Sequence, residues 1–117
     1  MIATPGMIYQ VNTLGGKIND AAFEKQSSYP HRAYDFVSEL QAYASARAHD
    51  DRQAVATTSI LKITEQHGIT RQYVNYCSLE FSNWEHAYYG DNYARLQAIK
   101  RKYDPNDNIR HPQSVKA

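Results

Sequence analysis

The stretch HRAYDFVSELQAYA, residues 31–44, decides whether the sequence predicts a sheet-based fold or an all-helical one. Its side chains fall on two alternating sides, namely Tyr34, Phe36, Leu40 and Ala42 on one and Asp35, Val37, Glu39, Gln41 and Tyr43 on the other. This alternation is typical of a half-buried β-strand. The spacing of Phe36, Leu40 and Tyr43 also suits one face of a helix, which remains the alternative. We predict a long strand over residues 31–44.

Two further strands are predicted on either side of this one. Residues 8–14 alternate in the same way, with Tyr9 and Val11 on one side of the strand. Residues 71–77 are rich in Tyr and Val, which favours a short strand there. Residues 17–30 are polar and contain Ser and Pro, so we expect a long surface loop between the first two strands.

Helices are predicted in the rest of the chain. From Asp51 a helical face recurs every three or four positions and ends at Gly68, through Ala56, Ile60, Ile63 and His67. Ser82-Asn83-Trp84-Glu85 has the Ser-x-x-Glu pattern of a capping box and predicts a helix start. A last helical face ends at Asp104-Pro105, through Asn92, Leu96, Ile99 and Tyr103. Residues 106–117 are expected to be irregular.

These elements predict an α+β fold, a small antiparallel sheet with helices packed on one face. A chain of 117 residues matches the size of one domain, so we expect residues 1–117 to form a single domain. Three strands and a small core are marginal for independent stability, which predicts a homo-oligomer or a partner chain.

Composition narrows the classes of function. The 13 basic and 12 acidic residues give a net charge of +1, which argues against nucleic-acid binding. No segment approaches the roughly 20 apolar residues of a membrane span. The single Cys77 allows no internal disulfide, and a cytoplasmic protein is expected. The five histidines lack a metal-binding spacing, so no metal is expected, and Cys77 is expected to pack as a small hydrophobe.

Two sets of residues carry a resemblance to a known family. The first comprises Tyr73-Val74-Asn75-Tyr76, Trp84, Tyr88-Tyr89-Gly90-Asp91-Asn92-Tyr93-Ala94-Arg95-Leu96, Ile99-Lys100, Lys102-Tyr103-Asp104-Pro105 and Arg110-His111-Pro112-Gln113-Ser114. It resembles the closing segment of berberine-bridge-type FAD-linked oxidases. The second, Gly15-Gly16 with Tyr29-Pro30-His31-Arg32, is similar to the preceding part of the same family's substrate domain. Asp107-Asn108-Ile109 departs from the family, which usually has an aromatic residue there.

The resemblance implies a flavoenzyme architecture. Members of this family have an N-terminal part that binds FAD, often through covalent bonds to His and Cys, and a C-terminal part that lays a sheet over the flavin. This sequence resembles the berberine-like C-terminal segment, and the flavin-binding domain is expected to be absent from residues 1–117. FAD is therefore implied either on a partner chain or as a cofactor that this chain has lost.

The resemblance also implies site residues. Tyr73 and Asn75 occupy the positions that approach FAD in the family, and their hydroxyl and amide groups suit contacts to a flavin edge. The alternative is that Asn75 pairs with backbone while Tyr73 packs. Glu39 is implied as the catalytic base, with Tyr43 beside it, if burial raises the pKa of the carboxyl group. If the match to the family is shifted by one residue, Ser38 takes this position instead of Glu39. The alternative to a catalytic role is that these residues form a solvated polar face.

Three functional hypotheses follow. The first is a component of an FAD-linked oxidoreductase. In it, this chain lines the pocket for a small-molecule substrate beside a flavin-binding partner. This hypothesis predicts an uncovered apolar sheet face. The second is a flavin-free cyclase or isomerase of specialised metabolism that closes the remnant pocket as a homodimer. The third is a non-catalytic binding module.

Overall fold

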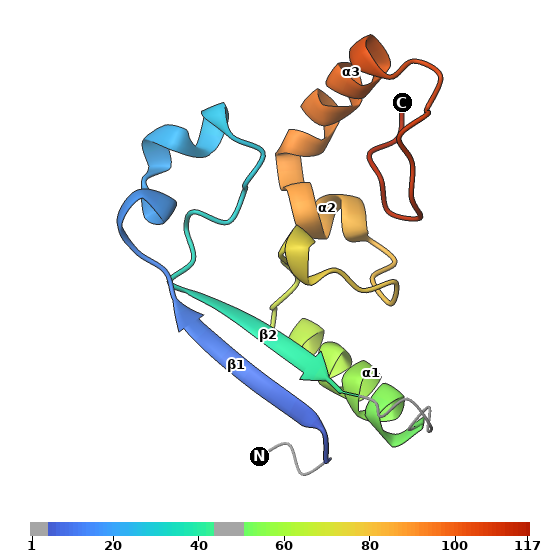
Figure 1. The fold of residues 1–117 in the computed structure, drawn as a ribbon. Coiled ribbons are helices and arrows are strands. Elements are labelled where there is room, and N and C mark those ends of the chain that lie inside the picture. The colour runs from blue at the N-terminus through green and yellow to red at the C-terminus, as the bar shows by residue number, and fades with distance from the viewer. Residues whose placement is uncertain (1–4, 44–50) are drawn as a thin grey trace. The chain divides into compact units, whose positions relative to one another are not determined.

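A computed structural model describes residues 5–43 and 51–117. They contain a two-stranded antiparallel sheet and three α-helices, which confirms the predicted α+β class (Figure 1). The chain forms two compact units. The first comprises Met1–Leu14 and Asp35–Thr70, and the second comprises Gly15–Tyr34 and Arg71–Ala117.

The sheet of the first unit pairs β1 (Met7–Thr13) with β2 (Phe36–Ala42). Tyr9 lies opposite Leu40 in this register. Both strands were expected from alternation, and the helical alternative for the second is wrong. β2 is shorter than the predicted stretch because residues 31–35 lie outside the ladder, while Ala44 is outside the described residues.

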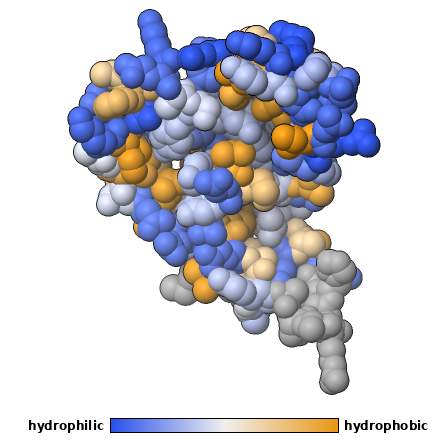
Figure 2. Space-filling view, turned by 45° about the horizontal axis from the view of Figure 1, so that its top comes forward, coloured by the Kyte–Doolittle hydropathy of each residue, from blue (hydrophilic) through white to orange (hydrophobic). Residues whose placement is uncertain are grey.

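One face of this sheet is apolar and open. Pairing in the observed register places Tyr9, Val11, Phe36 and Leu40 on the same side. Tyr9 is 47% exposed, Val11 54% and Phe36 62%. Figure 2 shows hydrophobic residues interspersed among hydrophilic ones on the molecular face in view. These exposures agree with the uncovered apolar sheet face expected from the first functional hypothesis.

Helix α1 (Asp51–Gln66) confirms the predicted helix and contacts β2. It ends in a Schellman motif, in which the Gly68 N–H donates to Glu65 O and the Ile69 N–H donates to Thr64 O, both at 2.9 Å. Gly68 has φ +79°, a left-handed conformation that glycine adopts without steric cost.

Replacing Gly68 with Ala should lower the free energy of unfolding by about 1 kcal/mol, because a Cβ atom disfavours the left-handed region. Urea unfolding followed by far-UV circular dichroism measures this loss. Gly15→Ala is the matched control, since Gly15 has extended backbone with φ 177° and open space where a Cβ atom would lie. Equal stability of the two variants would contradict the assignment of the helix end.

The second unit contains α2 (Trp84–Tyr89) and α3 (Tyr93–Tyr103), the tandem helices expected from the sequence. A short 3-10 turn, η4 (Gly90–Asn92), joins them. The predicted capping box is wrong, because Asn83 is the N-cap of α2 and makes no side-chain capping bond. Residues 106–117 contain neither helix nor strand, as predicted.

Two predictions for the second unit are corrected. The expected loop at residues 17–30 contains the 3-10 helices η1 (Gly16–Asn19) and η2 (Ala21–Gln26). The expected strand at residues 71–77 contains instead the 3-10 turn η3 (Val74–Tyr76). The Tyr76 N–H donates to Tyr73 O at 2.8 Å, so this backbone turns on itself and forms no ladder.

The buried hydrophobic core of the described residues comes from α2 and comprises Trp84, Ala87 and Tyr88. Half-buried side chains pack against it, namely Val74, Phe81, Tyr89 and Tyr93. Cys77 is exposed, so the expectation that it packs as a small hydrophobe is wrong. Among the described helices none has the length and apolar character that crossing a bilayer requires.

Candidate functional site

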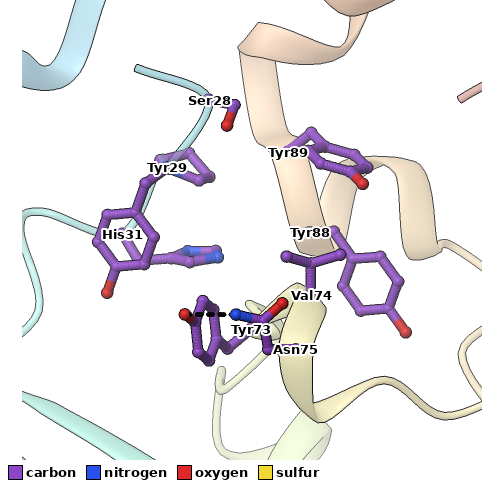
Figure 3. A pocket seen from close by; sticks show the side chains of 9 residues that line it. Ser28, Tyr29, His31, Tyr73, Val74, Asn75, Tyr88 and Tyr89 are labelled. Atoms are coloured by element: carbon purple, nitrogen blue, oxygen red, sulfur yellow. Dashed lines mark hydrogen bonds between the residues drawn. The ribbon is translucent and has the colours of Figure 1, made fainter.

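The second unit contains a cavity of about 220 Å³. Three segments line it: the loop after η2, the η3 region and α2 (Figure 3). The lining side chains are mainly aromatic, and the full set is Ser28, Tyr29, Pro30, His31, Tyr73, Val74, Asn75, Tyr88 and Tyr89. The fold therefore brings together two segments that are distant in the sequence and that both carried the family resemblance.

Arg32 holds the loop wall of the cavity in place. Its guanidinium group donates to Lys17 O at 2.9 Å and to Ile18 O at 2.8 Å. The same group lies 5.5 Å from the centre of the Tyr29 ring, within the range of a cation–π contact. Tyr29 in turn meets Tyr73 edge to face, with 5.9 Å between ring centres. This chain of contacts orients the aromatic wall.

Tyr73 and Asn75 form a hydrogen-bonded pair at the cavity wall. The Asn75 Nδ2 group donates to Tyr73 Oη at 2.7 Å, drawn as a dashed line in Figure 3. Asn75 thus pairs with a side chain. The alternative interpretation, in which Asn75 pairs with backbone, is not what the structure shows. Within residues 5–43 and 51–117 the Tyr73 hydroxyl proton, the second Asn75 N–H and the Asn75 carbonyl oxygen make no further bond, so this pair presents two donors and one acceptor.

His31 is buried at the cavity wall, with 7% of its surface exposed. Figure 3 shows its ring reaching into the space between the two walls. Neither Nδ1 nor Nε2 makes a hydrogen bond of good geometry within the described residues. Burial lowers the pKa of His31, and the charge of Arg71 acts in the same direction, while hydrogen bonding to the backbone of Gln72 and Tyr88 opposes both. The imidazole is therefore neutral at pH 7.

Sequence reasoning did not select His31 as a site residue. It noticed the histidine only as part of Tyr29-Pro30-His31-Arg32, a run that carried the family resemblance. Burial at the cavity wall is what distinguishes His31, and only the structure contains that information.

The α2 wall is held from outside the cavity. The Tyr88 hydroxyl donates to Gln113 Oε1 at 3.0 Å and accepts from the Ser78 N–H at 3.2 Å. Tyr89 stacks on Tyr93, with 6.0 Å between ring centres. Burial raises the pKa of both the Tyr88 and the Tyr89 hydroxyl groups. The Tyr88 hydroxyl is therefore already engaged by Gln113 and Ser78, and the Tyr88 ring forms part of the cavity wall.

The predicted catalytic residues lie in the first unit. Glu39 is half-buried on β2, opposite Gln10. Tyr43 follows β2 and is exposed, and its hydroxyl donates to Gln41 Oε1 at 2.6 Å. Ser38 is one position from Glu39 and so lies on the other face of the strand. Catalytic roles for Glu39 and Tyr43 stay predictions.

Known proteins resemble this chain over both cavity segments. Residues 72–116 match the family described as berberine and berberine like. An uncharacterized FAD-linked oxidoreductase of Bacillus subtilis, YgaK, is 35% identical over 87% of this chain and 22% of its own length. A carbohydrate oxidase of Microdochium nivale is 30% identical over 92% of this chain and 23% of its own length. A chitooligosaccharide oxidase of Gibberella zeae is 28% identical, with coverage of 92% and 23%.

These similarities concern one part of each relative. The chain spans 22% of the Bacillus relative and 23% of the Microdochium relative, or about a fifth of their lengths. The regions of this chain that match the relatives include the segments on both sides of the cavity.

Proposed function

Because residues 72–116 are a berberine-like segment of the FAD-linked oxidoreductase family, we propose that this chain forms the wall of a substrate pocket that faces FAD. The flavin is held by a flavin-binding domain, on a partner chain or elsewhere in a longer protein. The observation that carries the proposal is the Tyr73–Asn75 pair, since both residues carried the resemblance and both line the cavity.

The donor set of this pair fits a flavin. The pyrimidine edge of a flavin alternates carbonyl acceptors with an N–H donor. The Tyr73 hydroxyl proton and the Asn75 carbonyl oxygen offer the complementary donor and acceptor, and the Asn75–Tyr73 bond keeps the two groups in register. Bound FAD would supply the acceptor for a hydride, and the residues of this chain orient the edge of its ring.

Glu39 and Tyr43 are proposed as the acid–base groups that act on the substrate. Glu39 takes a proton from a substrate hydroxyl, and Tyr43 supplies a neighbouring hydroxyl. Glu39 is half-buried on β2, in the segment whose resemblance to the family implied this role. The names of the carbohydrate oxidase and the chitooligosaccharide oxidase support a hydroxylated small molecule as the substrate class. The proposed location is the cytoplasm.

The proposal is tested by titrating the chain with FAD and following backbone amides by nuclear magnetic resonance. Saturable shifts are expected at Tyr73 and Asn75. Asn75→Ala should weaken binding three- to tenfold, because one neutral hydrogen bond contributes about 1 kcal/mol. Asn106→Ala is the matched control, since Asn106 is exposed in the irregular tail and lines no part of the cavity.

Two outcomes would go against this function. Absence of shifts at Tyr73 and Asn75 would remove the flavin contact, as would unchanged affinity in Asn75→Ala. A colourless dimer that ignores FAD on a sizing column would instead support the flavin-free cyclase or isomerase. The apolar sheet face is equally compatible with that alternative, since a second copy could cover it.

A further inference from the structure

Arg71 joins the segment that leads into η3 to the last turn of α2. The Nη1 group of its half-buried side chain donates to His86 O at 2.7 Å. The Gln72 N–H donates to Ala87 O at 3.0 Å. Carbonyl groups in the last turn of a helix are commonly bonded by groups outside the helix, including cationic side chains. Two consecutive residues of the segment are thus bonded to two consecutive carbonyl groups of α2.

Gly90 leaves the space that the guanidinium group of Arg71 occupies. Gly90 is buried and directly follows α2. A Cβ atom at this position would lie 2.7 Å from Nη1, 3.4 Å from Cζ and 3.6 Å from Nη2 of Arg71. The guanidinium group therefore lies against the backbone of Gly90, where a larger residue would displace it. This close approach and the bond to His86 O together define one position for the Arg71 side chain.

The Tyr73–Asn75 pair has no hydrogen bond of its own to α2. Within the described residues, the bonds of these two residues stay inside one turn. Asn75 Nδ2 donates to Tyr73 Oη (Figure 3), and the Tyr76 N–H donates to Tyr73 O. These bonds hold the pair together, so its place relative to α2 has to come from the residues on either side of it.

Two anchors on α2 flank the pair. After it, the Ser78 N–H donates to Tyr88 Oη at 3.2 Å. Before it, Arg71 lies two positions from Tyr73 and donates from a charged group at 2.7 Å. Charge-assisted hydrogen bonds are shorter and stronger than neutral ones. Arg71 is therefore the stronger of the two anchors and stands next to the pair.

We propose that Arg71 is the positioning residue of the flavin contact, which anchors the Tyr73–Asn75 pair on α2 so that both side chains meet one edge of FAD. The inference rests on the proposed function and adds a residue to it. Arg71 is not part of the cavity lining, so it acts through the pair. Two hydrogen bonds to one ring edge need both partners in place to within about 0.5 Å. Loss of the anchor should therefore cost more than loss of either bond.

The anchor is tested first without flavin, in Arg71→Met, which keeps the length of the side chain and removes its charge and donors. Hydrogen exchange of the Gln72 amide should become about tenfold faster, and the side-chain amide signals of Asn75 should move. Arg71→Lys should restore both, because one Nζ–H can still reach His86 O. Arg101→Met is the matched control, since Arg101 is exposed on α3, and it should change neither signal. Unchanged exchange and signals in Arg71→Met would contradict the anchor.

FAD is then titrated into each folded variant. Arg71→Met should bind FAD at least about tenfold more weakly than the wild-type chain, because both contacts of the pair are misplaced. Arg71→Lys should bind within roughly threefold of the wild-type chain, and Arg101→Met should bind equally well. A residue that only stabilised the unit would lower the urea midpoint without changing the affinity of the folded chain. Unchanged affinity in Arg71→Met, or a loss that Arg71→Lys does not recover, would overturn the positioning role.

A measurement on the wild-type chain decides the case in which Arg71→Met does not fold. The bond to His86 O should hinder rotation of the Arg71 guanidinium group. Its two Nη nitrogens should then give separate signals by nuclear magnetic resonance, whereas the exposed Arg101 should give one averaged signal. An averaged signal at Arg71 would overturn the proposal.

Failure of this inference and failure of the proposed function give different results. Saturable FAD shifts at Tyr73 and Asn75 that Arg71→Met leaves intact would go against Arg71 alone. Absence of these shifts in the wild-type chain would go against the flavin contact, while exchange at Gln72 would still decide whether Arg71 anchors the pair.

Discussion

Replacing Tyr88 with Ala is expected to lower the free energy of unfolding by about 3–5 kcal/mol, the usual cost of truncating a large buried aromatic residue. Tyr88 is 2% exposed and lies at the centre of the hydrophobic core. Its ring packs against Phe81 and Trp84, with ring centres 6.1 and 6.3 Å away. Small domains have total stabilities of about 5–15 kcal/mol, so this loss would remove a large fraction of the stability.

Urea unfolding followed by Trp84 fluorescence measures this effect. Tyr88→Phe is the matched control, since it keeps the ring and removes only the hydroxyl group. It should cost about 1–3 kcal/mol, because Gln113 Oε1 loses its bond to the hydroxyl group. Equal losses in the two variants would show that the hydroxyl group, and not ring packing, dominates the contribution of Tyr88.

Asn substitution at Asp104 is expected to open the turn that follows α3 at neutral pH. The Asp104 carboxylate accepts from Lys100 Nζ and from the backbone N–H groups of Asn108 and Ile109, the last two at 2.8 and 2.9 Å. Lys100 Nζ also donates to Ile109 O. Asn keeps the shape of the side chain but loses the charge and one acceptor oxygen, so the turn loses its strongest bonds.

The same carboxylate predicts an acid transition. The hydrogen bond from Lys100, aided by the Ile109 N–H, lowers the pKa of Asp104 from 3.8 to about 2. A lowered pKa means that the folded state binds the proton less tightly than the unfolded state does. The contribution of Asp104 to stability is therefore complete above pH 3.8 and is lost as the pH falls to about 2.

Amide shifts of Asn108 and Ile109, followed by nuclear magnetic resonance between pH 6 and roughly pH 2, measure both effects. In the wild-type chain these amides should move together near the lowered pKa of Asp104. In Asp104→Asn they should show no such transition. Asp91→Asn is the control, since Asp91 is exposed in η4 and should leave the transition in place. A transition that persists in Asp104→Asn would assign it to another group.

Some elements are determined by local sequence. β1 and β2 follow from strict alternation, and α1 follows from a helical face that ends at a glycine suited to the left-handed cap. The tandem helices of the C-terminal region also follow from periodicity and from Asp104-Pro105, at which α3 ends. The berberine-like character of the chain was evident from the order and spacing of Tyr73, Asn75 and the residues after them.

Other features were decided only by the tertiary structure. Residues 71–77 have the composition of a strand, yet they pair with no strand among the described residues, and the Tyr76 N–H bonds within its own turn. Ser82 has the pattern of a cap, but the helix begins one residue later. His31 acquires its importance from burial beside Tyr73, a neighbour 42 positions along the chain. Periodicity records which side of an element is apolar, whereas burial and pairing depend on which distant segments meet.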